Sequence, residues 1–337
     1  MRTSAGRRVL ASLVAVTALT SVAGCSSRAD LLGLTANNQV SATVPPLTTA
    51  QAGAITRRAL AHAQQADASR STSAARTAFI GVALRTASAS YAVREIVDPA
   101  GDDLGAVLAP AAAPSRVIVT TGRSYPRSFV ALSRPTGSST DEVALLMTPN
   151  VQTPYRIASR ARLLPGAALP PTAASAQGAT ALPDDAPGLI ATPTEAVRDL
   201  ARLLQTGASA GTDFAPHPVV ASVRANAAGQ ARSVAKIATF TQRHAATDDP
   251  IQALRTTDGG ALVLATIERT DDFIVKKGAG YIQAPAAYQA LAGGLTKITR
   301  QASVKTLQVV VIVLPAEGAG PARLVAFSEL PFTVRAT

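Results

Sequence analysis

Apolar side chains recur at helical spacing in two parts of the chain, and each part predicts a helix that opens a folded unit. Near residue 50 one face of the predicted helix carries Ile55, Ala59, Leu60 and Ala63. Thr48 and Gln51 lie just before them with the spacing of a capping box. Near residue 200 the same spacing is found in Val197, Leu200, Leu203 and Leu204, which follow Thr194-Glu195 and end before Gly207.

Runs of β-branched and apolar residues, bounded by Gly, Pro and Ser, follow both predicted helices and indicate strands. In the first half the runs are 116–120, 128–133, 142–148 and 155–164. In the second half two hairpins are predicted, at 251–267 around Asp258-Gly259-Gly260 and at 304–330 around residues 317–321. The apolar run 309–314 is too short to span a membrane and predicts a central buried strand. The Ala-rich stretch 73–91 fits a helix or a strand.

Both halves of the chain therefore consist of a helix followed by an antiparallel sheet. This order predicts an α+β fold of two similar units, cone-shaped and NTF2-like or cystatin-like. We expect the units at residues 47–164 and 193–337, joined by a Pro/Ala-rich linker at residues 165–192. The halves share no visible sequence identity, so a duplication is a hypothesis about topology alone.

The N-terminal segment carries the strongest signal in the sequence. Basic Arg2, Arg7 and Arg8 precede an uncharged apolar stretch at residues 9–22, and Val22-Ala23-Gly24-Cys25 follows. This arrangement resembles the lipobox of bacterial lipoproteins. It predicts a cleaved signal peptide at residues 1–24 and lipid attachment at Cys25.

Lipid on Cys25 would place the mature chain at a cell membrane, on its extracytoplasmic face. Residues 25–46 are polar and end in Pro45-Pro46, which predicts a flexible tether. Arg7-Arg8 also partly fits a twin-arginine signal, so the export route is left open between the general and the twin-arginine pathways.

Composition limits the partners of the exported chain. The net charge of +11 favours anionic lipid headgroups or wall polymers, in addition to an envelope protein, as binding partners. Export and the scattered positions of the arginines argue against nucleic acid. A single cysteine excludes an intrachain disulfide. Aromatic residues make up only 4%, so the core must consist mainly of Ala, Val, Leu and Ile.

Two serines lie in patterns known from hydrolases, and neither pattern is complete. Ser209 is the centre of Gly207-Ala208-Ser209-Ala210-Gly211, but a nucleophile elbow needs a strand before the serine, and here a helix is predicted. Ser233 and Lys236 match S-x-x-K, yet the companion motifs of penicillin-binding enzymes are absent from the sequence. We expect no catalytic residue.

Acidic and histidine side chains offer weak candidates for metal or acid–base chemistry. Asp213 and His217 have the spacing of one helical face, but Pro216 and Pro218 disfavour a helix there and no third ligand is near in sequence. The pairs Asp248-Asp249 and Asp271-Asp272, considered for acid–base chemistry, fall at predicted strand ends, and Asp248-Asp249-Pro250 is typical of a turn. We therefore expect no metal and no cofactor.

Several short motifs resemble a family of uncharacterised actinobacterial lipoproteins over roughly residue 48 to the C-terminus. The motifs are Tyr155-Arg156, Leu163-Leu164-Pro165-Gly166-Ala167, Leu169-Pro170 and Thr257-Asp258-Gly259-Gly260-Ala261-Leu262-Val263. The resemblance implies an envelope setting and a domain of unknown function, with no catalytic residue to carry over.

Three functional hypotheses follow from these observations. The first is a non-enzymatic envelope lipoprotein that binds a protein, lipid or wall component. The second is a solute-capture lipoprotein with a ligand cleft between the two units. The third is a serine hydrolase that uses Ser209 or Ser233. A deep pocket where the halves meet would favour the second hypothesis.

Overall fold

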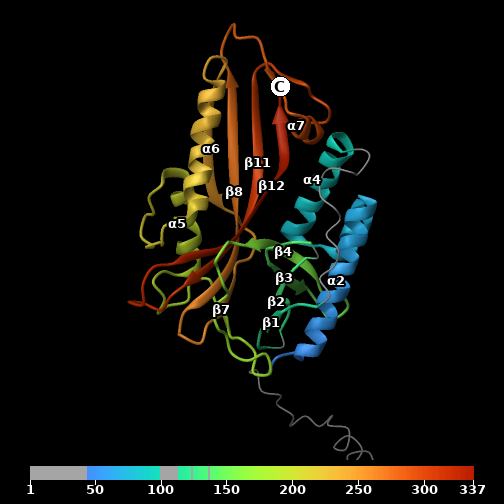
Figure 1. Ribbon diagram of the computed structural model, residues 1–337, viewed down its shortest axis with the longest axis vertical. Coiled ribbons are helices and arrows are strands. Elements are labelled where there is room, and N and C mark those ends of the chain that lie inside the picture. Colours follow the sequence, from blue (N-terminus) through green and yellow to red (C-terminus); the bar gives the residue numbers. More distant parts are fainter. Residues whose placement is uncertain (1–43, 99–112, 123, 136) are drawn as a thin grey trace, which may run out of the picture. The chain divides into compact units, whose positions relative to one another are not determined.

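A computed structural model describes residues 44–98, 113–122, 124–135 and 137–337 (Figure 1). The predicted signal peptide, Cys25 and the tether up to residue 43 lie outside the described residues. The first part contains helices α2 (Thr49–Ser69), α3 (Thr72–Ala78) and α4 (Gly81–Val97), then strands β1 (Arg116–Val119), β2 (Arg127–Ser133), β3 (Glu142–Thr148) and β4 (Arg156–Leu163). Helices and an antiparallel sheet confirm the predicted α+β class.

The second part adds the longer strands. Its elements are β5 (Ala181–Leu182), α5 (Pro193–Thr206), α6 (Pro218–Val234), β6 (Ala238–Ala246), β7 (Gln252–Arg255), β8 (Ala261–Val275), β9 (Ile282–Gln283), α7 (Ala286–Leu291), β10 (Lys297–Ile298), β11 (Gln301–Leu314) and β12 (Arg323–Ala336). Among these, the predicted hairpins are β7–β8 and β11–β12. The apolar run 309–314 lies in β11 between β8 and β12, as the sequence predicts for a central strand.

One sheet contains the strands of both predicted halves. Its order is β1-β2-β3-β4-β12-β11-β8-β7-β5, and β6 pairs with β8 beside β7. The halves join where β4 and β12 pair, through Leu163 with Ala326 and Arg162 with Phe327. Residues 43–337 form one compact unit. The predicted arrangement of two units is therefore not confirmed, and its NTF2-like or cystatin-like form stays a prediction.

The two ends of this sheet order also meet. Ala179, which precedes β5, donates its backbone N–H to the Val119 carbonyl at 2.7 Å and accepts one from Thr121 at 2.9 Å. The inner face is packed with apolar side chains from both halves. They include Ile118, Val130, Val143, Leu264, Leu307 and Val311.

The segment 165–192 differs from the expected interdomain linker. Besides the contact of Ala179 with β1, it forms backbone bridges between Thr172 and Thr256 and between Leu189 and Ala316. Leu169 is buried in the inner core. Backbone groups in this Pro/Ala-rich segment thus bond to strands of both halves, which fixes its path.

Helices cover the outer faces of the sheet. Helices α2, α3 and α4 pack on the first strands through a core that includes Phe79, Phe129, Leu146 and Ile157. Helices α5 and α6 pack on the long strands through a core that includes Leu200, Leu204, Val263 and Ile312. In the described part of the chain, no helix has the length and apolar character needed to cross a bilayer.

Candidate functional site

A cavity of about 430 Å³ lies where β4 and β12 separate. These strands pair at only two positions, so beyond Phe327 their edges diverge, and α4 contacts both. Side chains or backbone from α2, α4, β3, β4, β11 and β12 line the space. Both predicted halves of the chain therefore contribute to one cavity.

Part of the cavity lining is apolar. It consists of Val82, Ala83, Ala87, Leu307, Val309, Phe327 and Leu330. Val82, Leu307 and Val309 also belong to the inner core, so the cavity reaches the apolar interior of the sheet. Burial of apolar ligand surface here would contribute roughly 25 cal/mol per Å².

The rest of the lining is polar and charged. Asp67, Glu142 and Arg160 lie close to one another, with 4.0 Å between Arg160 Nη2 and Asp67 Oδ2. The hydroxyl of Tyr91 donates to Asp67 at 2.7 Å. Burial, followed by the hydrogen bond to Asp67 and its charge, raises the pKa of Tyr91 well above its ordinary value. Asp67 and Arg160 are thus occupied by protein partners.

Arg162 differs from Arg160. Its side chain is exposed, it lines the cavity, and within the described ranges it forms no ion pair. Its backbone N–H donates to Ser328 Oγ at 3.0 Å, which fixes the strand at the point where β4 and β12 part. The Arg162 guanidinium is therefore a cation at the cavity wall that is available to an anionic group.

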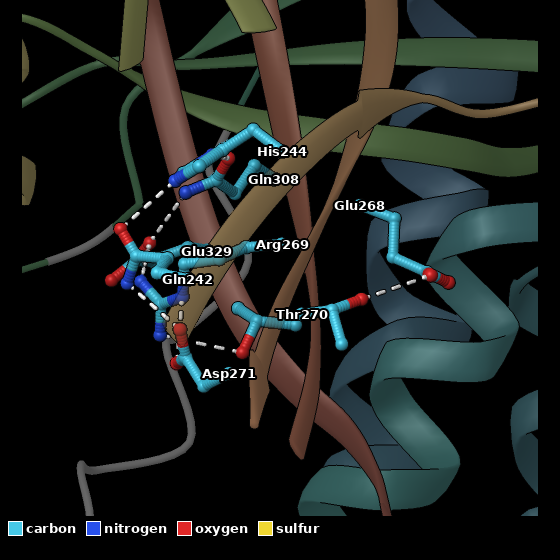
Figure 2. Close-up of polar contacts among 9 residues, drawn as sticks. Gln242, His244, Glu268, Arg269, Thr270, Asp271, Gln308 and Glu329 are labelled. Carbon is cyan, nitrogen blue, oxygen red and sulfur yellow. Dashed lines mark hydrogen bonds and ion pairs between the residues drawn. The ribbon is translucent and has the colours of Figure 1, made fainter. Parts of the chain in front are cut away.

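A second polar site lies on the face of the long strands that α5 and α6 cover (Figure 2). His244 Nδ1 is 3.0 Å from Gln308 Oε1, and its Nε2 is 3.0 Å from Gln242 Oε1. Gln242 Nε2 is 2.8 Å from Asp271 Oδ1. Gln308 Nε2 donates to Glu329 Oε2 at 2.9 Å. Figure 2 shows Glu268 apart from this cluster.

Arg269 joins the two carboxylates of this network. Its Nη1 is 2.8 Å from Glu329 Oε2, and its Nε is 3.1 Å from Asp271 Oδ2. The Nε–H is not aligned for a hydrogen bond to any described group. The network therefore spans β6, β8, β11 and β12, because its members lie opposite one another in the strand register.

Burial determines the electrostatics of the network. His244 and Asp271 are 7% and 6% exposed, and Gln308 is fully buried. Burial lowers the pKa of His244 to about 4, although its hydrogen bond to Gln308 acts in the opposite direction. Burial raises the pKa of Asp271, against the charge of Arg269. Both shifts favour the neutral forms of these two groups.

Neither serine candidate lies in a catalytic arrangement. Ser209 follows the C-terminus of α5 in a loop, so no strand precedes it as a nucleophile elbow requires. Ser233 lies in the last turn of α6, where its hydroxyl donates to the Gln230 carbonyl at 2.8 Å. Lys236 is exposed beyond that helix.

His217, Asp249, Asp258 and Asp272 each have a structural partner. His217 caps α6, where its Nδ1 accepts from the Val219 N–H at 3.1 Å, and the described residues include no group of three possible metal ligands. Asp249 pairs with Arg85, and Asp272 pairs with Arg243. Asp258 accepts the Gly260 N–H at 3.2 Å, as expected for a turn, and Gly260 has no room for a Cβ.

The sequence predicts neither the cavity nor the network. Of their residues, only Asp271 is among the candidates that the sequence offers. The only sequence signal for the network is polar residues two apart on strand faces that are otherwise mostly apolar. They are Gln242 and His244, Arg269 and Asp271, and Thr306 and Gln308. That spacing places each pair on one face of its strand.

A family model described as "Domain of unknown function (DUF8094)" matches residues 43–330. No curated protein and no solved structure matches the chain.

Proposed function

The chain belongs to the DUF8094 family, whose description assigns no function, and we propose from its cavity that it is a non-enzymatic binding protein for a small ligand. The observation that carries this proposal is the cavity of about 430 Å³ between β4, β12 and α4. Its size falls in the range of roughly 300–1,000 Å³ that is usual for small-molecule sites.

The lining suggests the chemistry of the ligand. Leu307, Val309 and Val82 offer an apolar surface, and Arg162 offers a guanidinium that forms no ion pair with the residues that the structure describes. A small amphiphile with an apolar body and one anionic group satisfies both. Asp67 and Glu142 disfavour a second anionic group beside Arg160, because like charges in a partly buried site repel.

The setting that we propose is the outer face of a cell membrane, with the chain held by lipid on Cys25. The support is the sequence of residues 1–25, with its basic start, apolar stretch and small residues before the cysteine. A lipid-anchored protein with a cavity fits solute or lipid capture better than catalysis, because Ser209 lies in a loop after α5 and the Ser233 hydroxyl donates to the Gln230 carbonyl. We propose no cofactor and no nucleic acid partner.

Cavity filling gives a direct test of the proposed binding function. Ser90 and Ser88 are both half-buried on α4, but only Ser90 lines the cavity. The probe is 1-anilinonaphthalene-8-sulfonate, an apolar anion whose fluorescence rises in apolar sites. The chain has no Trp to interfere.

We expect saturable binding of one probe molecule to the wild-type chain and to Ser88→Phe, and loss of that binding in Ser90→Phe. Arg162→Gln should weaken the probe about threefold to tenfold, since a partly exposed charge contact contributes roughly 1 kcal/mol. Arg198→Gln, an exposed arginine outside the cavity, is the control. Equal probe binding in Ser90→Phe and the wild type would refute the cavity as the site.

A further inference from the structure

The donor and acceptor of each hydrogen bond in the buried network can be assigned, because a carboxyl group lies at each end: Glu329 at one and Asp271 at the other. Glu329 is a partly exposed carboxylate paired with Arg269, so it is ionised and only accepts. Gln308 must therefore direct its amide N–H₂ to Glu329 and its amide oxygen to His244. It follows that His244 Nδ1 carries a proton and donates.

The other side of the imidazole cannot be satisfied in the same way. If Asp271 is ionised, Gln242 must direct its N–H₂ to Asp271 and its oxygen to His244 Nε2. A neutral imidazole with Nδ1–H has only a lone pair at Nε2, so two acceptors would face each other at 3.0 Å. An ionised Asp271 and a neutral His244 are therefore incompatible with this geometry.

One additional proton removes the conflict, and it has two possible positions. On His244 it gives an imidazolium that donates to both glutamines. A proton on Asp271 instead gives a carboxylic acid. The Gln242 amide then turns by 180°, so that its oxygen accepts from Asp271 Oδ1–H and its N–H₂ donates to His244 Nε2. Amide oxygen and nitrogen exchange places in this turn without moving the heavy-atom positions.

Burial decides between the two positions. His244 and Asp271 are both more than nine-tenths buried, so an arrangement with two neutral groups costs less than one with two additional charges.

We propose that the chain His244–Gln242–Asp271 is a proton-binding site that holds one proton at neutral pH on the Asp271 carboxyl. His244 is then neutral, with Nδ1–H donating to Gln308 and Nε2 accepting from Gln242. The site shares Glu329 with the lining of the cavity, but its test below uses no ligand.

The charges that face this site come from every element around it. Arg269 of β8 and Glu329 of β12 form one ion pair. Arg198 and Arg202 of α5 line the groove that His244 also lines, and the charge of Arg269 disfavours an imidazolium at His244. Tyr288 of α7 faces Asp271, and burial raises the pKa of this tyrosine, so it stays neutral. Helix α6 contributes apolar Val223 to the adjoining core.

Loss of the proton would leave two acceptors in contact inside the sheet. Among the described strands β6 pairs with β8 alone, and Gln242 and His244 link its buried side to Asp271 of β8 and Gln308 of β11. Release of the proton at high pH therefore weakens the attachment of β6.

Selective labelling of the full chain gives the direct test, because it contains only three histidines. The chain, in detergent micelles, is labelled with ¹⁵N at histidine and with ¹³C at the aspartate carboxyl. Single substitutions at His62, His217 and Asp271 assign the signals. At pH 7 we expect a neutral His244 in the Nδ1–H form and a protonated carboxyl at Asp271. An imidazolium at His244, or an ionised Asp271 beside a neutral imidazole, would overturn the proposal.

A pair of substitutions tests the same site without spectroscopy. Asn in place of Asp271 supplies an N–H donor where the protonated carboxyl has O–H, whereas Ala supplies none. Asp271→Asn should change the thermal midpoint at pH 7 by less than about 2 °C, and Asp271→Ala should lower it by at least about 5 °C. Asp272→Asn, at the neighbouring exposed ion pair, is the control. Equal destabilisation by Asn and Ala at position 271 would contradict a protonated carboxyl.

Discussion

His244 and Asp271 show how burial sets the protonation of single residues in this protein. Each lies in a strand whose other inward-facing side chains are mostly apolar, and each is held by amide groups in addition to a charge. The pKa of His244 falls and that of Asp271 rises for the same reason, which is the cost of burying a charge. Because the two pKa values shift in opposite directions, the change of the free energy of unfolding with pH reports the protonation of both residues.

In the wild-type chain the two shifts act in opposite directions. The His244 contribution is complete above the ordinary pKa of 6.5 and is lost as pH falls through about 4. The Asp271 contribution is complete below its ordinary pKa of 3.8 and is lost as pH rises through the raised pKa. With the proton that we propose on Asp271, the folded and the unfolded chain each hold one proton on this pair below the ordinary pKa of His244.

We predict that this pair makes the free energy of unfolding fall as pH rises above 6.5 in the wild type. In Asp271→Asn only His244 titrates, so the pair's contribution should instead rise by about 2–3 kcal/mol between pH 4 and 6.5 and then stay level. Urea denaturation across pH 4 to 9 measures both profiles. Parallel profiles for the two proteins would show that Asp271 holds no proton.

At the scale of single elements, helix α5 illustrates what local sequence determines. Its apolar face, its end at Gly207 and its acidic first turn all follow from the sequence. The cap of α5 is Thr192, which accepts the Glu195 N–H at 3.2 Å, and Glu195 in turn accepts the Thr192 N–H at 3.0 Å. Pro193 then occupies the first helical turn, where its missing N–H costs nothing.

Thr192→Ala should lower the free energy of unfolding by about 0.5–2 kcal/mol, because it leaves backbone donors of the first turn unsatisfied. Thr194→Ala, inside the same turn and without a capping bond, should have an effect within about 0.5 kcal/mol. Chemical denaturation at pH 7 compares the two. A larger loss at position 194 than at 192 would contradict this assignment of the cap.

Helix α6 shows where local reasoning fails. Pro216 and Pro218 disfavour a helix through Asp213 and His217, and residues 213–217 are not helical; α6 begins only at Pro218, with His217 as its cap. Proline is disfavoured inside a helix and tolerated at its start. The following residues are mostly small, and only Val223 and Val234 of the helix are buried. Their pattern carries too weak a period to predict α6 from the sequence.

At the scale of the whole described chain, the decisive contacts lie far apart in sequence. The pairing of β4 with β12 and the bridge from β1 to Ala179 make one sheet out of strands that the sequence predicts individually. Strand identity follows from local alternation, but partner choice depends on long-range packing that no local pattern encodes. The cavity arises from this pairing, because it lies where β4 and β12 separate, and so it could not be predicted.

The central claim is that a lipid-anchored chain carries a small ligand in this cavity. Native mass spectrometry of the full protein, extracted from its own membrane, tests it most directly. We predict a chain that begins at an acylated Cys25 and releases one non-covalent small molecule on activation. That molecule should persist in Ser88→Phe and be absent in Ser90→Phe. A chain with an unmodified Cys25, or one without a ligand that depends on Ser90, would contradict the account.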